Sequence, residues 1–464
     1  MHPNEVDTDE VTVRANEVVS LASKRLIKPL LVCFACEPKR GSEYGTGWHF
    51  IEELSKTMPV YVLAHELHRE SIESYMPHHP YHPIHFRYVN MPLLRRTIWG
   101  PELGINLYYF LWHYKARKTL QAWHEQEKFD LTHHITFTRH WMGTVASSLE
   151  IPFIWGPVGG GRAIPRAFQT GISFKHRFVE GARSLMRQMW HFDPILRRSV
   201  RNADVALATA RDTGELMAKL GVKNLDVMSA TALPIGQFES LRNVIPQSKI
   251  DGKFRFVFVG RVSHWKGLEL AIEAFANLKD VPHATLRIVG DGPTFESLKQ
   301  RIHALGIADR VELPGYFEHA QNIEQMAQCD VLLHPALRDS AGCAAEGIRI
   351  GKPIICFDIG TPAILMDDHC GIRVPLDNPR QAVKGLEAAM RQLATDPALY
   401  ERLRLGALAR DHAISREARG ARLLDLYRSV ATSRGLEVFV PCSKPCPEPF
   451  AERCPVPCPE RCPE

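Results

Sequence analysis

The sequence predicts an α/β protein with two parallel β-sheet domains, and three observations carry that prediction. Short apolar runs that suit buried strands alternate with segments whose apolar spacing suits helices. The alternation stops at a polar stretch without clear periodicity, residues 236–253, and then starts again. The chain has 464 residues, which is enough for two domains that each bury a core of their own.

The first half opens with the order strand, loop, helix, strand, which is typical of a doubly wound parallel sheet. The run LLVCFA is the first predicted strand and VYVLA the second. Strands are expected at residues 30–35, 60–64, 85–89, 130–136, 152–155 and 205–209. Helices are expected at residues 49–56, 106–124 and 212–220.

The second half repeats the pattern. Strands are expected at residues 254–259, 286–289, 311–313, 331–333 and 353–357. Helices are expected at residues 268–278, 295–305, 322–328, 344–350, 397–413 and 416–431. We therefore divide the chain into an N-terminal tail (1–28), a first domain (29–240), a linker (241–253), a second domain (254–415), a closing helix (416–435) and a disordered Pro- and Cys-rich tail (436–464).

Composition and charge favour a soluble globular protein. The net charge is +5, from 57 basic and 52 acidic residues, and this small excess argues against a nucleic-acid-binding protein. No run approaches the length of a membrane span, and the first 28 residues lack the apolar core of a secretory signal. The cysteines of the two domains are scattered through predicted strands and helices, as expected of reduced thiols in a cytoplasmic protein.

An anion site is predicted where the strand at residues 254–259 ends. The stretch FRFVFVGRVSHWKG turns at Gly260, carries Arg261 and Lys266 in the turn, and opens a largely apolar helix at Gly267. A strand, a loop with two cations and a helix N-terminus together suit phosphate, and we favour a diphosphate. The alternative is that both cations are solvated loop charges.

Two glycine-rich segments of the first half are candidate ligand loops. The first holds Gly41, Gly45 and Gly47, and the second, GPVGGG at residues 156–161, ends a predicted strand. His133 and His134 lie in the strand DLTHHIT and point in opposite directions, so only one of them is able to face a cleft. A buried, hydrogen-bonded histidine is the alternative for either of them.

Three further segments leave alternatives open. The stretch at residues 174–201 is amphipathic and basic, which indicates a solvated helix face or, alternatively, a membrane-surface face. The histidines of PHHPYHPIH at residues 77–85 and the five cysteines of the C-terminal tail have spacings that zinc sites also use. A plain loop and an unfolded tail, respectively, are the simpler interpretations.

In their order along the chain, these blocks resemble family 4 of the retaining glycosyltransferases. In the second half, FVFVGRVSHWKGLELAIEAF is similar to the G-R-x-x-x-x-K-G segment of that family. LRIVGDGP, VELPGYF and DVLLHPALRDSAGCAAEGIRIGKPII follow in the family's order. In the first half, ACEPKRGSEYGTGW, FDLTHHITFTRHW and IPFIWGPVGGG resemble one subgroup, so the likeness spans about residues 29–431.

The resemblance implies the GT-B fold, in which two Rossmann-like domains face each other and a C-terminal helix crosses back. It also implies a donor site in the second domain and contacts from the first. Arg261 and Lys266 would hold the donor diphosphate, Glu346 the ribose and Asp339 the sugar hydroxyls, while His134 would orient the acceptor. Backbone groups near the donor would come from Gly260, Ser340, Gly342, Cys343, Ala344, Gly45 and Gly47.

One departure from the family concerns its E-x₇-E pattern. Eight residues before Glu346 stands Arg338, and Asp339 is the nearest acid, so the loop is one residue short. The implied reaction needs no cofactor and no divalent metal, which agrees with the absence of a convincing D-x-D element. The adjacent pair Asp367-Asp368 suits a solvated turn.

The implied function is transfer of a sugar from a nucleotide-sugar donor to a glycan or lipid-linked acceptor, in surface or exported polysaccharide synthesis. The protein is expected to be cytoplasmic, with peripheral contact at the membrane through residues 174–201. Two alternatives remain, a nucleotide-sugar epimerase of the same fold and a non-catalytic nucleotide-sugar-binding scaffold with a degenerate donor site.

Overall fold

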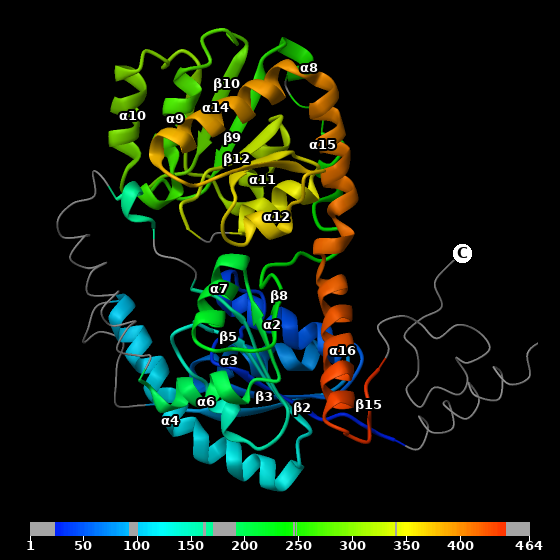
Figure 1. Cartoon of the computed structure of the whole chain (residues 1–464). Helices are drawn as coiled ribbons and strands as arrows, with labels where there is room; N and C mark the ends of the chain where they lie inside the picture. The colour runs from blue at the N-terminus through cyan, green and yellow to red at the C-terminus, as the bar shows by residue number, and fades with distance from the viewer. Residues whose placement is uncertain are drawn as a thin grey trace, which may run out of the picture.

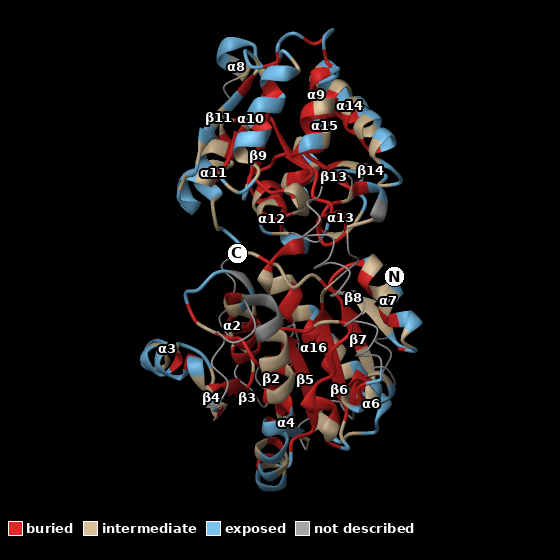
Figure 2. Ribbon diagram, turned by 90° about the vertical axis from the view of Figure 1, so that its left-hand side faces the viewer, coloured by how far each residue is buried: buried red, intermediate tan, exposed pale blue. Residues whose placement is uncertain are grey.

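The computed structural model describes residues 24–91, 101–160, 164–169, 192–244, 246, 248–338 and 341–441. Two α/β domains lie one above the other, each with a parallel sheet between helices (Figure 1). The buried residues gather on the strands and on the helix faces that cover them (Figure 2). The predicted fold class is confirmed.

The N-terminal domain has a seven-stranded parallel sheet in the order β4-β3-β2-β5-β6-β7-β8. Its strands are β2 Pro29–Cys33, β3 Val60–His65, β4 Ile84–Val89, β5 Leu131–Thr136, β6 Phe153–Val158, β7 Val205–Ala208 and β8 Leu225–Val227. Its helices are α2 Ser42–Ser55, α3 Arg69–Tyr75, α4 Pro101–Glu127, α6 Pro194–Asn202 and α7 Arg211–Lys219. The central strands β2 and β5 are buried along their whole length, because helices cover both faces of the sheet.

The C-terminal domain has a six-stranded parallel sheet in the order β11-β10-β9-β12-β13-β14. Its strands are β9 Phe254–Val259, β10 Ala284–Val289, β11 Val311–Gly315, β12 Val331–His334, β13 Ile354–Phe357 and β14 Gly371–Val374. Its helices are α8 Ser248–Asp251, α9 Leu268–Ala276, α10 Phe295–Ala304, α11 His319–Ala327, α12 Gly342–Arg349, α13 Pro362–Leu365, α14 Pro379–Thr395 and α15 Pro397–Arg410.

Short 3₁₀ helices complete the connections. They are η1 Glu66–His68, η2 Met76–His78, η3 Val145–Ser148, η4 Arg166–Phe168, η5 Glu239–Leu241, η6 His264–Lys266 and η7 His412–Ile414. Of these, η5 lies in the polar stretch between the two sheets, and η6 lies in the predicted anion loop.

The chain returns to the N-terminal domain through helix α16, Arg416–Ser433, as predicted (Figure 1). This helix packs on α2, and its Tyr427 hydroxyl lies 2.7 Å from His133 Nδ1. Beyond it, β15 (Val438–Phe439) pairs with β1 (Arg25–Leu26), so residues at both ends of the described chain meet. The predicted tail from residue 436 therefore begins with an ordered strand, while residues 442–464 lie outside the described residues.

Several predicted features fall outside the described residues. These are residues 1–23 of the N-terminal tail, residues 174–191 of the basic stretch and the five cysteines of the C-terminal tail. The membrane-surface and zinc alternatives for these segments therefore stay predictions. In the parts of the chain that the structure covers, no helix is both long and apolar enough to cross a membrane.

Candidate functional site

The loop that follows β9 is held in place by close backbone contacts with neighbouring loops. Gly260 has a φ of +143°, and Gly267 has a φ of +68°, both in the region that favours glycine. A Cβ at Gly267 would overlap the carbonyl oxygen of Pro335, in the segment after β12. The N–H of Leu337 also donates to the carbonyl of Trp265 at 2.8 Å. The loops after β9 and β12 therefore form one unit at the carboxyl edge of the sheet, where ligands of such folds bind.

A buried cation stands in this loop. Lys266 is 5% exposed, and its ammonium group lies beside Gly260 and 4.4 Å from the ring centre of Trp265. Burial lowers the pKa of Lys266, and the nearby charge of Arg338 lowers it further. Because Lys266 sits so close to neighbouring positive charge, an anion in this loop would relieve both the repulsion and the desolvation.

Two exposed arginines accompany Lys266. Arg261 directly follows Gly260, and the Arg338 guanidinium lies 5.0 Å from the ring centre of Trp265. The indole of Trp265 is thus contacted by two cations, those of Lys266 and Arg338. Arg338 was not predicted as a site residue. In the sequence, only its position next to Asp339 indicated that it lies near the candidate site.

The N-terminus of α12 lies next to Lys266. Cys343, in its first turn, donates its thiol to the Val259 carbonyl at 3.2 Å, which ties the start of α12 to the end of β9. Burial raises the pKa of the Cys343 thiol, while the charge of Lys266 opposes that rise. The first N–H groups of a helix, here those of Gly342, Cys343 and Ala344, have no partners within the helix and favour an anion. The buried cation and the helix start therefore face the same loop.

Glu346 lies one turn further along α12, and its carboxylate is already engaged. Its Oε1 lies 2.6 Å from His319 Nε2, at the start of α11. The hydrogen bond to Glu346 raises the pKa of His319, which favours an imidazolium–carboxylate pair. A ribose at Glu346 would share that carboxylate with His319. No sequence pattern indicated this partner, because α11 and α12 come together only in the folded chain.

Asp339 and Ser340 lie outside the described residues. Their predicted contacts, and the effect of the shortened loop before Glu346, therefore stay predictions. On either side of these two residues, Arg338 lies beside Trp265 and Ala341 lies at the start of α12.

Gly45 and Gly47 lie in a helix and not in the predicted loop, while their contact with the donor stays a prediction. Both lie within α2, which begins at Ser42, and both are buried. A Cβ at Gly45 would overlap the Arg40 carbonyl oxygen, and one at Gly47 would overlap that of Ala35. Their missing side chains allow the segment after β2 to pack on α2.

His134 is also placed differently from the prediction that it contacts the acceptor. Its side chain is fully buried, and its Nε2 lies 3.0 Å from the Tyr109 hydroxyl of α4. Burial lowers the pKa of His134 well below its ordinary value, so the ring is neutral. His133 points to the opposite face and lies 2.6 Å from the Gly156 carbonyl. The alternation of the two side chains is as predicted, but neither histidine is exposed to a cleft.

The two domains meet beside the loop after β9. His264 Nε2 lies 3.0 Å from the Phe168 carbonyl, and Phe168 packs in the core of the C-terminal domain. Thr361 donates to the Thr209 carbonyl at 3.3 Å, again across the domain boundary. In the second glycine-rich segment, residues 156–161, Gly160 packs against the Trp141 ring. Gly161 lies outside the described residues.

Metal ligands do not gather anywhere in the part of the chain that the structure describes. No three His, Cys, Asp or Glu side chains there form a set able to hold a metal ion. Asp367 and Asp368 pair with Arg410 and Arg373, respectively. Independence from divalent metal stays a prediction.

Residues 242–407 match the family model of the glycosyl transferases group 1. The 2-deoxystreptamine glucosyltransferase of Streptomyces kanamyceticus is 28% identical over 224 residues, which cover 42% of this chain and 57% of that protein. The lipopolysaccharide core biosynthesis glycosyltransferase LpsD of Rhizobium meliloti is 32% identical over 177 residues, 37% of this chain and 50% of that protein. The chain thus matches between half and three fifths of the length of these relatives.

Two solved structures share the fold over most of the chain. Anabaena HepE, in complex with UDP and glucose, has a TM-score of 0.54 at 17% identity and covers 87% of this chain and 100% of its own. The lipopolysaccharide outer core galactosyltransferase WaaB, in its apo form, has a TM-score of 0.57 at 14% identity and covers 88% and 100%, respectively. The chain therefore has the GT-B fold, and its residues 242–407 are similar to the glycosyl transferases group 1 family.

Proposed function

We propose that the protein transfers a sugar from a nucleoside-diphosphate donor to a glycan or lipid-linked acceptor. The observation that carries the proposal is the buried Lys266 in the loop after β9, next to the N-terminus of α12. Such an arrangement suits the diphosphate of a nucleotide sugar, because it neutralises charge that grows as the sugar leaves. HepE, which shares the fold, is crystallised with UDP and glucose.

In this proposal the bond between the anomeric carbon and the diphosphate oxygen breaks, and a bond to the acceptor oxygen forms. The acceptor proton passes to the departing diphosphate, so the protein need not supply a base from the N-terminal domain. Lys266, Arg261 and the N–H groups of α12 would stabilise the diphosphate, and Glu346 would hold the ribose. We also propose that the sugar keeps its anomeric configuration and that the reaction needs no divalent metal.

The setting we propose is the synthesis of a surface or exported polysaccharide. The relatives include LpsD, a glycosyltransferase of lipopolysaccharide core biosynthesis, and a 2-deoxystreptamine glucosyltransferase. The proposal includes contact with a membrane surface through residues 174–201, which sedimentation with anionic vesicles at low salt tests. A protein that stays in the supernatant would contradict the membrane contact.

A thermal-shift screen against UDP-, GDP-, ADP- and dTDP-sugars tests the donor. A true donor binds only the folded state, and at about 100 times its Kd it adds roughly 2.7 kcal/mol of stability. One of the four should therefore raise the melting temperature by several degrees. The same donor incubated without acceptor should give no epimerised nucleotide sugar. A melting temperature that none of them raises would favour the scaffold alternative, and a new nucleotide sugar would favour the epimerase.

A further inference from the structure

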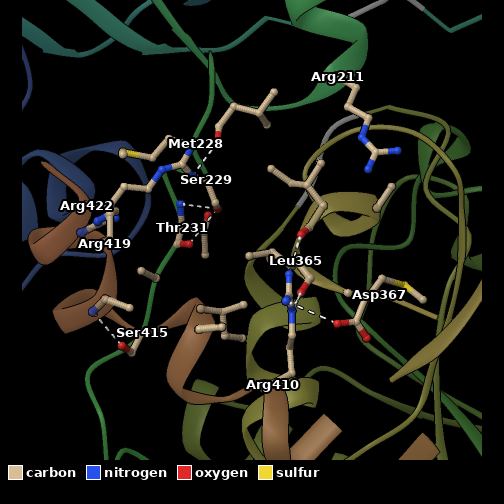
Figure 3. Close-up of a pocket in the computed structure, with 18 of the residues that line it drawn as sticks. Arg211, Met228, Ser229, Thr231, Leu365, Asp367, Arg410, Ser415, Arg419 and Arg422 are labelled. Carbon is tan, nitrogen blue, oxygen red and sulfur yellow. Dashed lines mark hydrogen bonds and ion pairs between the residues drawn. The ribbon is translucent and has the colours of Figure 1, made fainter. Parts of the chain in front are cut away.

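Two segments carry the chain from one domain to the other, and they bind each other. The first crossing connects β8 with β9, and the second, residues 411–415, connects α15 with α16. Arg416, where α16 begins, donates its N–H to the Leu233 carbonyl of the first crossing at 3.0 Å. Figure 3 shows the two crossings side by side, with Arg419 of α16 next to the first. The two crossings therefore form one connection between the domains.

Open space separates the domains beside these crossings. A cavity of about 480 Å³ lies there, lined by the segment after β8, by residues 363–369 of the C-terminal domain and by the start of α16 (Figure 3). Because this space interrupts the packing between the domains, the crossings carry the connection on that side. The residues that hold the crossings in place are therefore the ones that set how the two domains lie relative to each other.

Arg349 holds both crossings from the C-terminal domain. It is the last residue of α12 and has no exposed surface. Its Nη1 donates to the Pro234 carbonyl at 2.5 Å, and its Nη2 donates to the Leu233 carbonyl at 2.9 Å, both in the first crossing. Its guanidinium also pairs with Asp411 of the second crossing. A single side chain of the C-terminal domain thus contacts both crossings.

The ion pair between Arg349 and Asp411 is buried and shared with a third group. Asp411 is 6% exposed and also pairs with Arg242 of the first crossing. Burial lowers the pKa of Arg349, and the charge of Asp411 opposes that effect. A buried ion pair adds little net stability, but removing one partner leaves a buried charge and is costly. The pair therefore holds the crossings in one geometry.

The other end of α12 belongs to the candidate donor site. Glu346 lies one turn before Arg349, and Cys343 in the first turn is bonded to the Val259 carbonyl at the end of β9. The helix has eight residues, so it is about 12 Å long. One short helix therefore joins the candidate donor site to both crossings.

We propose that Arg349 is a positioning residue, which fixes the N-terminal domain relative to the donor site by holding both crossings against the end of α12. The inference rests on the proposed function, in which the donor binds the C-terminal domain and the acceptor meets it at the domain boundary. Arg349 contacts neither of them, because its guanidinium is engaged by the crossings. Its loss should therefore impair transfer and leave donor binding intact.

Steady-state transfer and calorimetric donor titration of two variants test the proposal. Arg349→Met combined with Asp411→Asn removes the pair without leaving a buried charge, and its kcat should fall by about tenfold to a hundredfold, as for reacting groups displaced by about 1 Å. Its Kd for the nucleoside diphosphate of the donor should stay within about twofold. Arg349→Lys keeps the charge but loses the planar fork, so its kcat should fall less. Arg402→Gln, at an exposed arginine of α15, is the control and should match the unmodified chain.

Hydrogen exchange of the backbone amides measures the hold on the crossings directly. In the double variant, amides of residues 230–236 and 411–417 should exchange faster, while those of the loop at residues 260–267 should exchange as in the unmodified chain. Arg349→Lys decides both measurements if the double variant does not fold.

An unchanged kcat would overturn the proposal. So would an equal loss of kcat and donor affinity, because that is the result of a general loss of structure in the C-terminal domain. Exchange at the crossings that stays as in the unmodified chain would also overturn it. If the unmodified chain itself binds no nucleotide sugar, the proposed function fails, and the exchange measurement alone then decides whether Arg349 holds the crossings.

Discussion

The two domains use their polar side chains in opposite ways. In the N-terminal domain, burial lowers the pKa of a set of histidines, which are neutral and hydrogen-bonded: His49, His65, His113, His133 and His134. In the C-terminal domain, His264 and His319 each pair with a glutamate that raises their pKa, and cations line the loop after β9. The buried histidines of the first domain therefore hold its structure, whereas the loop after β9 in the second domain presents cations that suit an anionic ligand.

Lys266→Ala should have the largest effect, because it removes the buried cation of the proposed donor site. Loss of one preorganised donor to a developing anion costs about 10²–10³-fold in kcat. Lys299→Ala, on exposed α10 of the same domain, is the control and should keep full activity. Steady-state transfer assays with the donor found in the screen measure both variants. Undiminished transfer by Lys266→Ala would place the diphosphate elsewhere.

Mild acid should destabilise the protein through the neutral histidines of the N-terminal domain. The pKa of His113 is lowered to about 3 and that of His133 to about 4, from 6.5. The unfolded chain therefore binds protons below pH 6.5 that the folded chain does not, so stability is full above that pH and falls below it. Each such histidine contributes a slope of about 1.4 kcal/mol per pH unit.

Guanidinium unfolding followed by tryptophan fluorescence at several pH values between about 7.5 and 5 measures this slope. The raised pKa values of His264 and His319 act in the other direction, since their stabilisation is present below pH 6.5 and is lost as pH rises. A free energy of unfolding that stays constant or grows on acidification would show that the N-terminal histidines are not neutral in the fold.

Glu346→Gln tests two roles of this carboxylate in the C-terminal domain, donor binding and the pairing with His319. It replaces a carboxylate by an amide, which should weaken donor binding about tenfold, as for a lost charge-assisted hydrogen bond. It should also return the pKa of His319 toward its ordinary value, which an NMR titration of the imidazole measures. Glu324→Gln on exposed α11 is the control for both readouts. A donor affinity that is equal in Glu346→Gln and the control would exclude Glu346 from the site.

His134→Gln should have the smallest effect on catalysis. Its ring is buried against Tyr109, so the variant should lose about 1 kcal/mol of stability, the net value of one hydrogen bond. Its kcat at neutral pH should change less than about twofold, because no proton transfer passes through this ring in our proposal. A large loss of kcat in a variant that melts normally would restore His134 as an acceptor-contacting residue.

The sequence was sufficient where a strand is long, apolar and buried on both faces. β2 and β9 follow from such runs, and the parallel sheets follow from the alternation of strands and helices. The return of α16 was implied by the resemblance to the glycosyltransferase family. β8 and β14 were missed, because these edge strands are short and only partly buried. Helix α14 was also missed, although Asn378 caps it and Pro379 begins it.

The candidate site was predictable where one motif holds its parts together, as for Gly260, Arg261 and Lys266. It was not predictable where contacts depend on chain segments far apart, as for His319 with Glu346 or Trp265 with Arg338. Gly45 was expected in a loop but lies in α2, since a glycine that allows two segments to pack has the same sequence signature as a glycine of a loop.

Calorimetric titration of the nucleoside diphosphate of the identified donor tests the central claim most directly. We predict one site per chain, with affinity at least about tenfold lower in Lys266→Ala and within about twofold of the unmodified chain in His134→Gln. Equal affinity in Lys266→Ala together with a loss in His134→Gln would place the donor on the N-terminal domain and contradict the account.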